Sequence, residues 1–211
     1  MKTDCYIPAN GHCEELHSRL EIDRNIMTKK KNILAIVGSA SSNSSNLKLV
    51  ERIAGLTENE LKLTIFNDLK MLPHFDPEIS GANPPKLIVA FRNGIEKSDG
   101  IIICTPEYIF SIPSGLKNAV EWCISTTVFS DKPTGLITAS AGGQKGHEEL
   151  QLIMKTAMAK FTNDTTLLIQ GIKGKFDEQG NLTDMETQKR LDKFIKDFIN
   201  LVNDRQPKEK R

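Results

Sequence analysis

Hydroxyl and amide side chains crowd into one short segment, GSASSNSSN, between Gly38 and Asn46. An apolar run from Ile33 to Val37 precedes it, and apolar residues at helical spacing follow it from Leu47. In a strand–loop–helix arrangement, the backbone N–H groups of the loop and the positive end of the helix dipole point at one spot, which favours an anion. Hydroxyl and amide groups can donate further hydrogen bonds to a phosphate there. The expected phosphate ligands are Ser39, Ser41, Ser44, Ser45 and Asn46.

The pattern of glycines and lysines limits which phosphate-containing ligand this segment could bind. The segment lacks G-x-x-x-x-G-K-[ST], so it places no lysine on a nucleotide β- or γ-phosphate. It also lacks G-x-G-x-x-G, which admits the pyrophosphate of a dinucleotide. A hydroxyl-lined loop without lysine suits the single terminal phosphate of FMN, neutralised by backbone dipoles. The alternative is a Ser/Asn-rich turn in which Ser45 or Asn46 caps the helix.

Two later segments follow apolar runs of their own. TPEYIFSIPSGLKNAVEW, from Thr105 to Trp122, is stiffened by two prolines and carries flat apolar side chains that can support an isoalloxazine ring. PTGLITASAGGQKG, from Pro133 to Gly146, ends a strand pattern in glycines that permit close backbone approach to a ligand. For each segment the alternative is an ordinary turn packed on the core. The expected flavin contacts are Pro106, Glu107, Tyr108, Ile109, Ser140, Gly142 and Gly143.

These segments need a scaffold that brings them together, and the hydrophobic pattern predicts one. Apolar runs of strand length lie at 33–37, 61–66, 101–104, 135–139 and 165–169. Helical patterns begin at Leu47 and at Ser114 and cover 86–97, 147–161 and 185–202, whereas 67–85 and 173–183 are expected to be loop. Alternating strands and helices predict an α/β fold, a doubly wound five-stranded parallel sheet of order 2-1-3-4-5 with helices on both faces. Ligands of such sheets bind beyond the carboxyl ends of the strands, where these loops would converge.

The helical patterns also predict which side chains face the core. Over 86–97 these are Leu87, Ala90, Phe91 and Ile95, and over 147–161 they are Leu150, Ile153, Met154, Ala157 and Met158. Cys104 and Cys123 lie in apolar surroundings and are expected to be buried free thiols. His74, between Pro73 and Phe75, is expected to lie in a surface loop.

The composition limits the classes of protein to which the chain can belong. The 211 residues carry 28 Lys and Arg against 27 Asp and Glu, a net charge of +1, which argues against a nucleic-acid footprint. No apolar run reaches the length of a membrane span, and the first residues lack the apolar core of a signal peptide. Four cysteines without a disulfide framework suggest a reducing compartment, so a cytoplasmic protein is expected.

The first residues differ in pattern from the rest. We expect an N-terminal extension over 1–31, a single domain over 32–203 and a tail over 204–211. Residues 1–26 are expected to be either a dispensable extension or an artefact of start-codon choice. Cys5, His12, Cys13 and His17 offer four potential zinc ligands, but adjacent His12 and Cys13 suit one tetrahedral site poorly, so no metal is expected.

From Asn32 to Leu201 the chain resembles the NAD(P)H-dependent FMN reductase family, which includes quinone, chromate and azo-dye reductases. Its segment 38–46 is similar to the family's G-S-x-R-x-x-S-x-N loop. Three stretches resemble the P-E-Y-N…P-G…L-K-N-A…W segment: Pro106-Glu107-Tyr108, Ser111 with Pro113, and Leu116-Lys117-Asn118-Ala119 with Trp122. Lys132-Pro133, Ser140, Gly142-Gly143 and Gly146 match K-P…S-x-G-x-x-G. Ser41, Ile109 and Ser114 depart from the family's arginine, asparagine and glycine.

The resemblance implies FMN as cofactor and NAD(P)H as co-substrate. It implies ping-pong hydride transfer to the flavin and on to a small-molecule acceptor: a quinone, free flavin, azo compound or metal oxyanion. FMN carries the chemistry, so no catalytic side chain is named. It also implies a homodimer or homotetramer, with no nucleic acid or membrane as partner. Both NADH and NADPH remain open as reductant. The rival functions are a flavodoxin-type electron carrier that does not oxidise NAD(P)H itself and a nucleotide-binding regulatory domain.

Overall fold

The structure of the protein is a computed structural model that describes residues 29–41 and 43–204. The chain divides into two units, 1–30 and 31–211, and the fold described here is that of the second. The four potential zinc ligands and residues 1–28 of the expected extension lie outside the described residues. The first strand begins at Lys31, one residue inside that expected extension.

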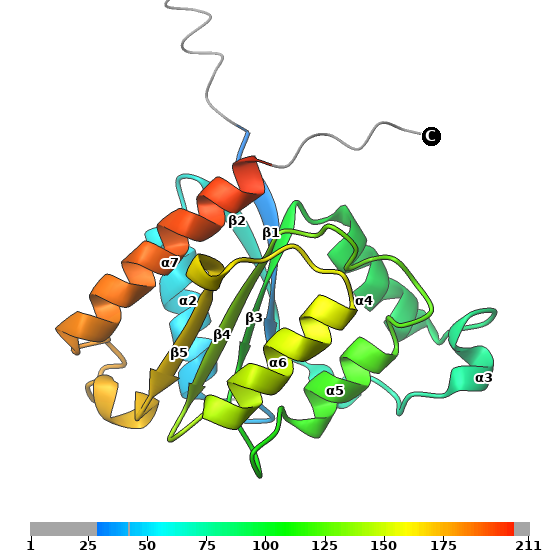
Figure 1. Ribbon diagram of the computed structural model, residues 1–211, viewed down its shortest axis with the longest axis horizontal. Helices are drawn as coiled ribbons and strands as arrows, with labels where there is room; N and C mark the ends of the chain where they lie inside the picture. The colour runs from blue at the N-terminus through cyan, green and yellow to red at the C-terminus, as the bar shows by residue number, and fades with distance from the viewer. Residues whose placement is uncertain (1–28, 42, 205–211) are drawn as a thin grey trace, which may run out of the picture. The chain divides into compact units, whose positions relative to one another are not determined.

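Five parallel strands form a sheet in the order β2-β1-β3-β4-β5, which confirms the predicted topology. Their arrowheads point to the same edge of the sheet in Figure 1, so the loops that follow them lie together there. The strands are β1 (Lys31–Val37), β2 (Leu61–Phe66), β3 (Gly100–Thr105), β4 (Thr134–Ser140) and β5 (Thr166–Gln170).

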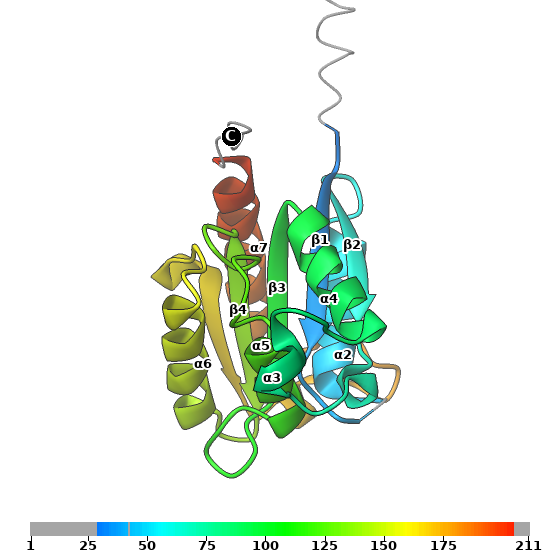
Figure 2. The same ribbon diagram turned by 90° about the vertical axis from the view of Figure 1, so that its right-hand side faces the viewer.

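Helices cover both faces of this sheet, as Figures 1 and 2 show. The long helices are α2 (Ser45–Leu56), α4 (Lys86–Lys97), α5 (Ser114–Glu121), α6 (Gln144–Thr156) and α7 (Met185–Asn203). The short elements are α3 (Pro77–Ser80) and the 3-10 turns η1 (Leu69–Met71), η2 (Asn163–Thr165) and η3 (Ile172–Lys175).

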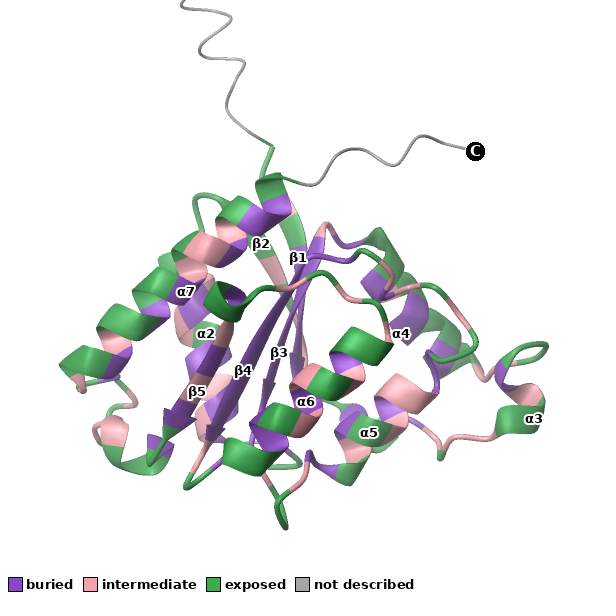
Figure 3. Ribbon diagram, in the orientation of Figure 1, coloured by how far each residue is buried: buried purple, intermediate pink, exposed green. Residues whose placement is uncertain are grey.

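The core has two layers because alternate strand residues point to opposite faces of the sheet. Ala35 and Val37 of β1 join a cluster with α2 and α7, whereas Leu34 and Ile36 join a cluster with α4, α5 and α6. The central strands are buried along their length in Figure 3, as expected of a parallel sheet covered on both faces. A sheet fixed on both sides gives the loops at its carboxyl edge a rigid base.

Helix α4 faces the core with a different stripe from the predicted one. Leu87 and Ala90 are exposed, and the buried positions are Ile88, Phe91, Arg92 and Ile95. Arg92 is buried because its guanidinium donates hydrogen bonds to the carbonyl oxygens of Ser80 and Trp122. A charged residue that satisfies its donors inside the fold hides the apolar stripe from a pattern-based prediction.

Helix α6 spans Gln144–Thr156 rather than 147–161. It begins directly after Gly143, whose φ of 99° ends the preceding loop, and it ends before Met158, whose φ of 59° cannot continue a helix. Met158 was predicted to face the core and is 61% exposed instead. The segment 67–85 is also not wholly loop, because Asp76 caps α3 by accepting a hydrogen bond from Glu78 N at 2.9 Å.

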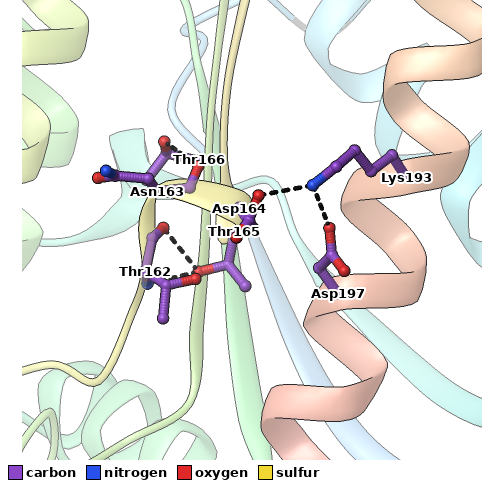
Figure 4. A network of polar contacts seen from close by, with 7 residues as sticks. All are labelled: Thr162, Asn163, Asp164, Thr165, Thr166, Lys193 and Asp197. Atoms are coloured by element: carbon purple, nitrogen blue, oxygen red, sulfur yellow. Dashed lines mark hydrogen bonds and ion pairs between the residues drawn. The ribbon is translucent and has the colours of Figure 1, made fainter.

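The amino end of β5 is fastened to α7 by the polar network in Figure 4. Lys193 Nζ lies 2.6 Å from Asp164 Oδ1 and 2.7 Å from Asp197 Oδ2, joining the turn η2 to the helix. Thr162 N donates to Thr165 Oγ1 at 2.9 Å within the same turn. The network precedes β5 and therefore lies at the other end of the strand from the loops that carry the predicted site.

Candidate functional site

A cavity of about 530 Å³ opens at the carboxyl edge of the sheet. Its walls come from the loops after β1, β3, β4 and β5, the edge at which doubly wound sheets bind ligands. Glu107, Ile109, Gly142 and Gly143 were predicted to contact the cofactor and do not line it. The predicted residues that do line it are Ser39, Ser41, Ser44, Ser45, Asn46, Pro106, Tyr108 and Ser140.

The loop after β1 leads into the N-terminus of α2. Ser44 is the N-cap, with its Oγ accepting a hydrogen bond from Leu47 N at 3.1 Å, so the cap is neither Ser45 nor Asn46. A hydroxyl that accepts one bond still has a proton to donate to a ligand. Gly38 begins the loop, and a Cβ there would lie 2.2 Å from Thr105 Oγ1. Only glycine therefore lets the chain leave the sheet at this point.

The Asn46 side chain makes hydrogen bonds within the protein. Its Nδ2 donates to Ala139 O at 3.1 Å, and its Oδ1 lies 3.3 Å from Cys104 Sγ, which donates to it. The side chain is buried and ties α2 to the ends of β3 and β4. Asn46 thus lines the cavity while its amide group is engaged inside the protein, and it holds the loops in register.

The side chain of Glu107 holds the loop after β3 in place. Its Oε1 accepts from Gly143 N at 3.2 Å and its Oε2 from Gly146 N at 2.7 Å. The carboxylate therefore occupies N–H groups at the start of α6, where the helix dipole favours a negative charge. A Cβ at Gly146 would lie 3.1 Å from Glu107 Cβ, so the glycine makes room for this side chain.

A second carboxylate fastens the same loop further along α6. Glu149 Oε2 accepts from Ser111 Oγ at 2.6 Å and from Ile112 N at 2.9 Å. Lys117 Nζ lies 3.8 Å from Glu149 Oε1. The loop that follows β3 is therefore fixed at two points to the helix that follows β4, which makes that wall of the cavity rigid.

The tip of the β3–α5 loop is a tight hairpin. Tyr108 and Ser111 exchange backbone hydrogen bonds at 2.9 and 3.0 Å, and the two residues between them, Ile109 and Phe110, have φ of 52° and 59°. Positive φ is strained for a β-branched residue such as isoleucine. Ile109 is 95% exposed, so its side chain points away from the fold, while Tyr108 lines the cavity.

A second hollow of about 310 Å³ adjoins the cavity and shares Ser39 and Tyr108 with it. Lys70 and His74, from the segment between β2 and α4, lie on its wall. His74 is exposed in a loop, as predicted, and this loop lies beside the site.

One wall of the cavity was not predicted from the sequence, and it is formed by Gly171, Ile172, Lys173 and Gly174. These residues follow β5, and the predicted strand order already places the carboxyl end of β5 at the ligand edge. The glycines and the lysine after that strand were the available signal, but 173–183 was expected to be polar loop and no role was predicted for Gly171 or Ile172.

Thiol chemistry does not contribute to this site. Cys104 and Cys123 are buried free thiols, as predicted. Burial raises the pKa of the Cys123 thiol to about 12 and raises the pKa of Cys104 as well, so both stay protonated near neutral pH. Among residues 29–41 and 43–204, no group of three His, Cys, Asp or Glu side chains is placed to hold a metal ion.

The sequence profile of the NADPH-dependent FMN reductases matches residues 31–171, which include the loops after β1, β3 and β4. The chain belongs to this family. Its cofactor is therefore FMN and its reductant is NAD(P)H. No helix in the described part of the chain is long and apolar enough to cross a membrane.

Individual relatives agree with this assignment. The chain is 31% identical over 185 residues to the NADH-dependent flavin reductase subunit 2 of Lactobacillus johnsonii, covering 82% of this chain and 98% of the relative. It is 31% identical over 172 residues to an NADPH:quinone oxidoreductase of Arabidopsis thaliana, covering 77% and 87%. The solved structure of FerB, an NAD(P)H:(acceptor) oxidoreductase from Paracoccus denitrificans, superposes with a TM-score of 0.69 at 25% identity, covering 82% and 97%.

Proposed function

We propose that the cavity holds FMN, with its phosphate against Ser39, Ser41, Ser44 and Ser45 at the N-terminus of α2. The observation that carries this placement is a capped helix N-terminus, rich in hydroxyl donors, opening into one cavity with Pro106, Tyr108 and Ser140. The volume of about 530 Å³ lies in the usual range of cofactor sites, about 300–1,000 Å³.

The helix ends favour the same orientation. The first N–H groups of α6 at Gly143 and Gly146 are already satisfied by Glu107. The start of α2, by contrast, lines the cavity itself through Ser44, Ser45 and Asn46, and a helix N-terminus favours an anion. The phosphate is accordingly assigned to the loop after β1, and the flavin ring to the walls made by the loops after β3 and β4.

The protein's side chains bind and orient rather than exchange protons. When bound, FMN supplies the two-electron chemistry, taking hydride from NAD(P)H and passing electrons to an acceptor. Tyr108 and Pro106 shape the wall beside the ring, and Glu107 and Glu149 hold that wall in place. The acceptors we propose are quinones, free flavins, azo compounds and metal oxyanions.

Flavin titration tests this proposal. The expected result is FMN binding near one per chain, followed by oxidation of NAD(P)H in the presence of a quinone. Tight binding of FAD in place of FMN, or no quenching of flavin fluorescence, would contradict it. FMN binding without NAD(P)H oxidation would favour the flavodoxin-type carrier instead.

We also propose that the protein is a homodimer joined through α5 and α6. A groove of about 370 Å³ lies between these helices, and Ile124, Leu152 and Met158 on its wall are 76%, 65% and 61% exposed. An exposed apolar patch of this kind favours a protein interface. Sedimentation of the parent and of the double variant Ile124→Glu, Leu152→Glu tests it: a dimer is expected for the former and a monomer for the latter. A monomeric or tetrameric parent would contradict the assignment.

We place the protein in the cytoplasm. The support is that the two cysteines of the described part, Cys104 and Cys123, are free thiols in the core, which suits a reducing compartment.

A further inference from the structure

The loop after β5, which forms one wall of the cavity, is held in place by contacts with the rest of the fold. Gly171 N donates to Ala141 O at 3.1 Å, which joins this loop to the one after β4. Ile172 is 3% exposed and anchors the turn η3 in the core cluster of α2 and α7. The two residues before Lys173 therefore hold it beside the cavity.

The two lysines of this turn differ in their surroundings. Lys175 Nζ lies 2.7 Å from Asp184 Oδ1, and this ion pair with the hydrogen bonds from Thr187 lowers the pKa of Asp184 to about 2. Lys173 is exposed, lines the cavity, and has no hydrogen bond or ion pair with any residue of the described ranges 29–41 and 43–204. Its ammonium group is available to a ligand of the cavity.

Lys173 matters for binding because the rest of the described cavity lining carries no positive charge. The described lining consists of serine, asparagine, glycine, proline and apolar side chains together with Tyr108, and Lys173 is the one cation among them. The segment 38–46 contains neither lysine nor arginine. A phosphate monoester carries close to two negative charges at pH 7 because its second pKa is ~6. Backbone dipoles and hydroxyls alone would have to offset that charge.

We propose that Lys173 is the counter-charge for the phosphate monoester bound at the start of α2. This rests on the proposed placement of FMN in the cavity. The cation comes from the loop after the fifth strand rather than from the phosphate loop itself. A phosphate monoester is present on FMN and, as the 2′-phosphate, on NADPH, and we assign Lys173 to FMN because Ser44 and Ser45 line the same cavity.

The experiment titrates FMN and riboflavin, which lacks the phosphate, into the parent protein and the variants Lys173→Gln, Lys173→Arg and Lys189→Gln. Lys189 is an exposed lysine of α7 that does not line the cavity, so its variant removes the same charge elsewhere. Binding is followed by flavin fluorescence at low and at high salt, and KM values for NADPH and NADH are then measured at saturating FMN.

For Lys173→Gln we expect a three- to tenfold (~1 kcal/mol) weaker affinity for FMN, a reduction typical of an exposed but charge-assisted contact. Riboflavin affinity should stay within about twofold of the parent, because no phosphate is present to lose the contact. The salt dependence of FMN binding should also become weaker. Lys173→Arg and Lys189→Gln should behave as the parent does.

Three results would overturn the inference, and each would reject a different part of it. If the parent binds FMN no more tightly than riboflavin, the phosphate placement itself is wrong. If the parent prefers FMN and Lys173→Gln keeps that preference in full, only the assignment of Lys173 is wrong. If Lys173→Gln instead raises the KM for NADPH and not for NADH, the lysine serves the 2′-phosphate of the reductant.

Discussion

The Glu107 carboxylate accepts hydrogen bonds from two backbone N–H groups at the start of α6. The backbone carbonyl oxygen of Glu107 accepts a hydrogen bond from Ser140 Oγ at 3.4 Å. Glu107→Gln leaves one acceptor oxygen and turns an amide NH₂ toward a backbone donor. We expect this to lower the free energy of unfolding by about 1–3 kcal/mol. FMN affinity should fall as well, since Ser140 and Tyr108 lie on the wall that Glu107 holds.

Thermal unfolding and FMN titration measure these two effects. Glu148→Gln is the matched control, because Glu148 lies on α6, its side chain is half-exposed, and it accepts hydrogen bonds from Gln144 and Lys145 of the same helix. Equal, small effects of both substitutions would show that Glu107 does not hold the loop.

His147 gives a second test at the scale of a single side chain. It is 7% exposed, with Nδ1 2.9 Å from Thr138 Oγ1, and burial lowers its pKa from 6.5 although Glu148 opposes the change. The unfolded chain therefore takes up this proton at higher pH than the folded protein does. Stability from His147 is complete above the unfolded pKa and is lost as the pH falls from there toward the lowered folded pKa.

Denaturant unfolding at about pH 7.5 and about pH 5.5 measures this loss, which belongs to the window around the unfolded pKa of histidine. We expect His147→Asn, which keeps a polar atom near Thr138 but does not titrate, to show a smaller difference between the two conditions than the parent. An unchanged difference would assign the pH dependence to other groups.

At individual positions, the sequence predicted which loops form the site better than it predicted what each residue does. Hydroxyl-rich and glycine-rich loops can be recognised without a structure, and Ser39, Ser44 and Ser140 do line the cavity. Glu107 and Asn46 have side chains committed to protein partners, which depend on contacts between distant segments. Lys173 was missed although its place after the fifth strand was a signal in the sequence.

At the scale of an element, substitutions at Ile109 test the backbone conformation of the β3–α5 loop. Its φ of 52° is strained for a β-branched residue, and its 95% exposure means that little packing is lost when it is replaced. Ile109→Asn should raise the free energy of unfolding by about 1 kcal/mol, since asparagine tolerates this conformation. Ile109→Val keeps the branched Cβ and should bring no gain. Thermal unfolding compares the two, and a loss of stability in Ile109→Asn would contradict the hairpin geometry.

Helices and strands with strong apolar periodicity were predicted well. The predictions failed where a single residue, such as a buried arginine or a glycine before a helix, departs from the usual pattern. β2 and α4 have the predicted limits because apolar runs and breakers agree there. The inner face of α4 was misjudged because buried Arg92 is polar in sequence yet satisfied in the fold. The start of α6 was misjudged because Gly143 acts as the residue before the helix, not as part of a flexible loop.

At the scale of the whole molecule, the core of the described residues begins with β1. Both hydrophobic clusters are formed by residues from Ile33 to Val202. We therefore expect a variant lacking residues 1–26 to remain folded and to bind FMN as the full chain does. Thermal unfolding, flavin titration and zinc analysis of both forms measure this. Loss of soluble protein or of FMN affinity would assign a structural role to the segment, and one zinc per full-length chain would assign it a metal site.

The strand order and the ligand edge were predictable because alternating strands and helices allow few topologies. The second hollow beside Tyr108 was not, because Lys70 and His74 reach it from a segment that has no sequence signal of its own.

The measurement that tests the account most directly is the FMN dissociation constant of Ser44→Ala, followed by turnover at saturating FMN. Loss of a hydrogen bond to a charged phosphate should weaken FMN binding about ten- to a hundredfold. Turnover with bound FMN should stay near that of the parent, whereas a change at Tyr108 should alter turnover more than affinity.

Ser44 also caps α2, so Ser44→Asp serves as the companion variant: it keeps a capping oxygen but repels the phosphate. The account predicts that Ser44→Asp binds FMN more weakly than Ser44→Ala while unfolding at a temperature close to that of the parent. An unchanged FMN affinity in Ser44→Ala together with abolished turnover would contradict the placement of the phosphate in this loop.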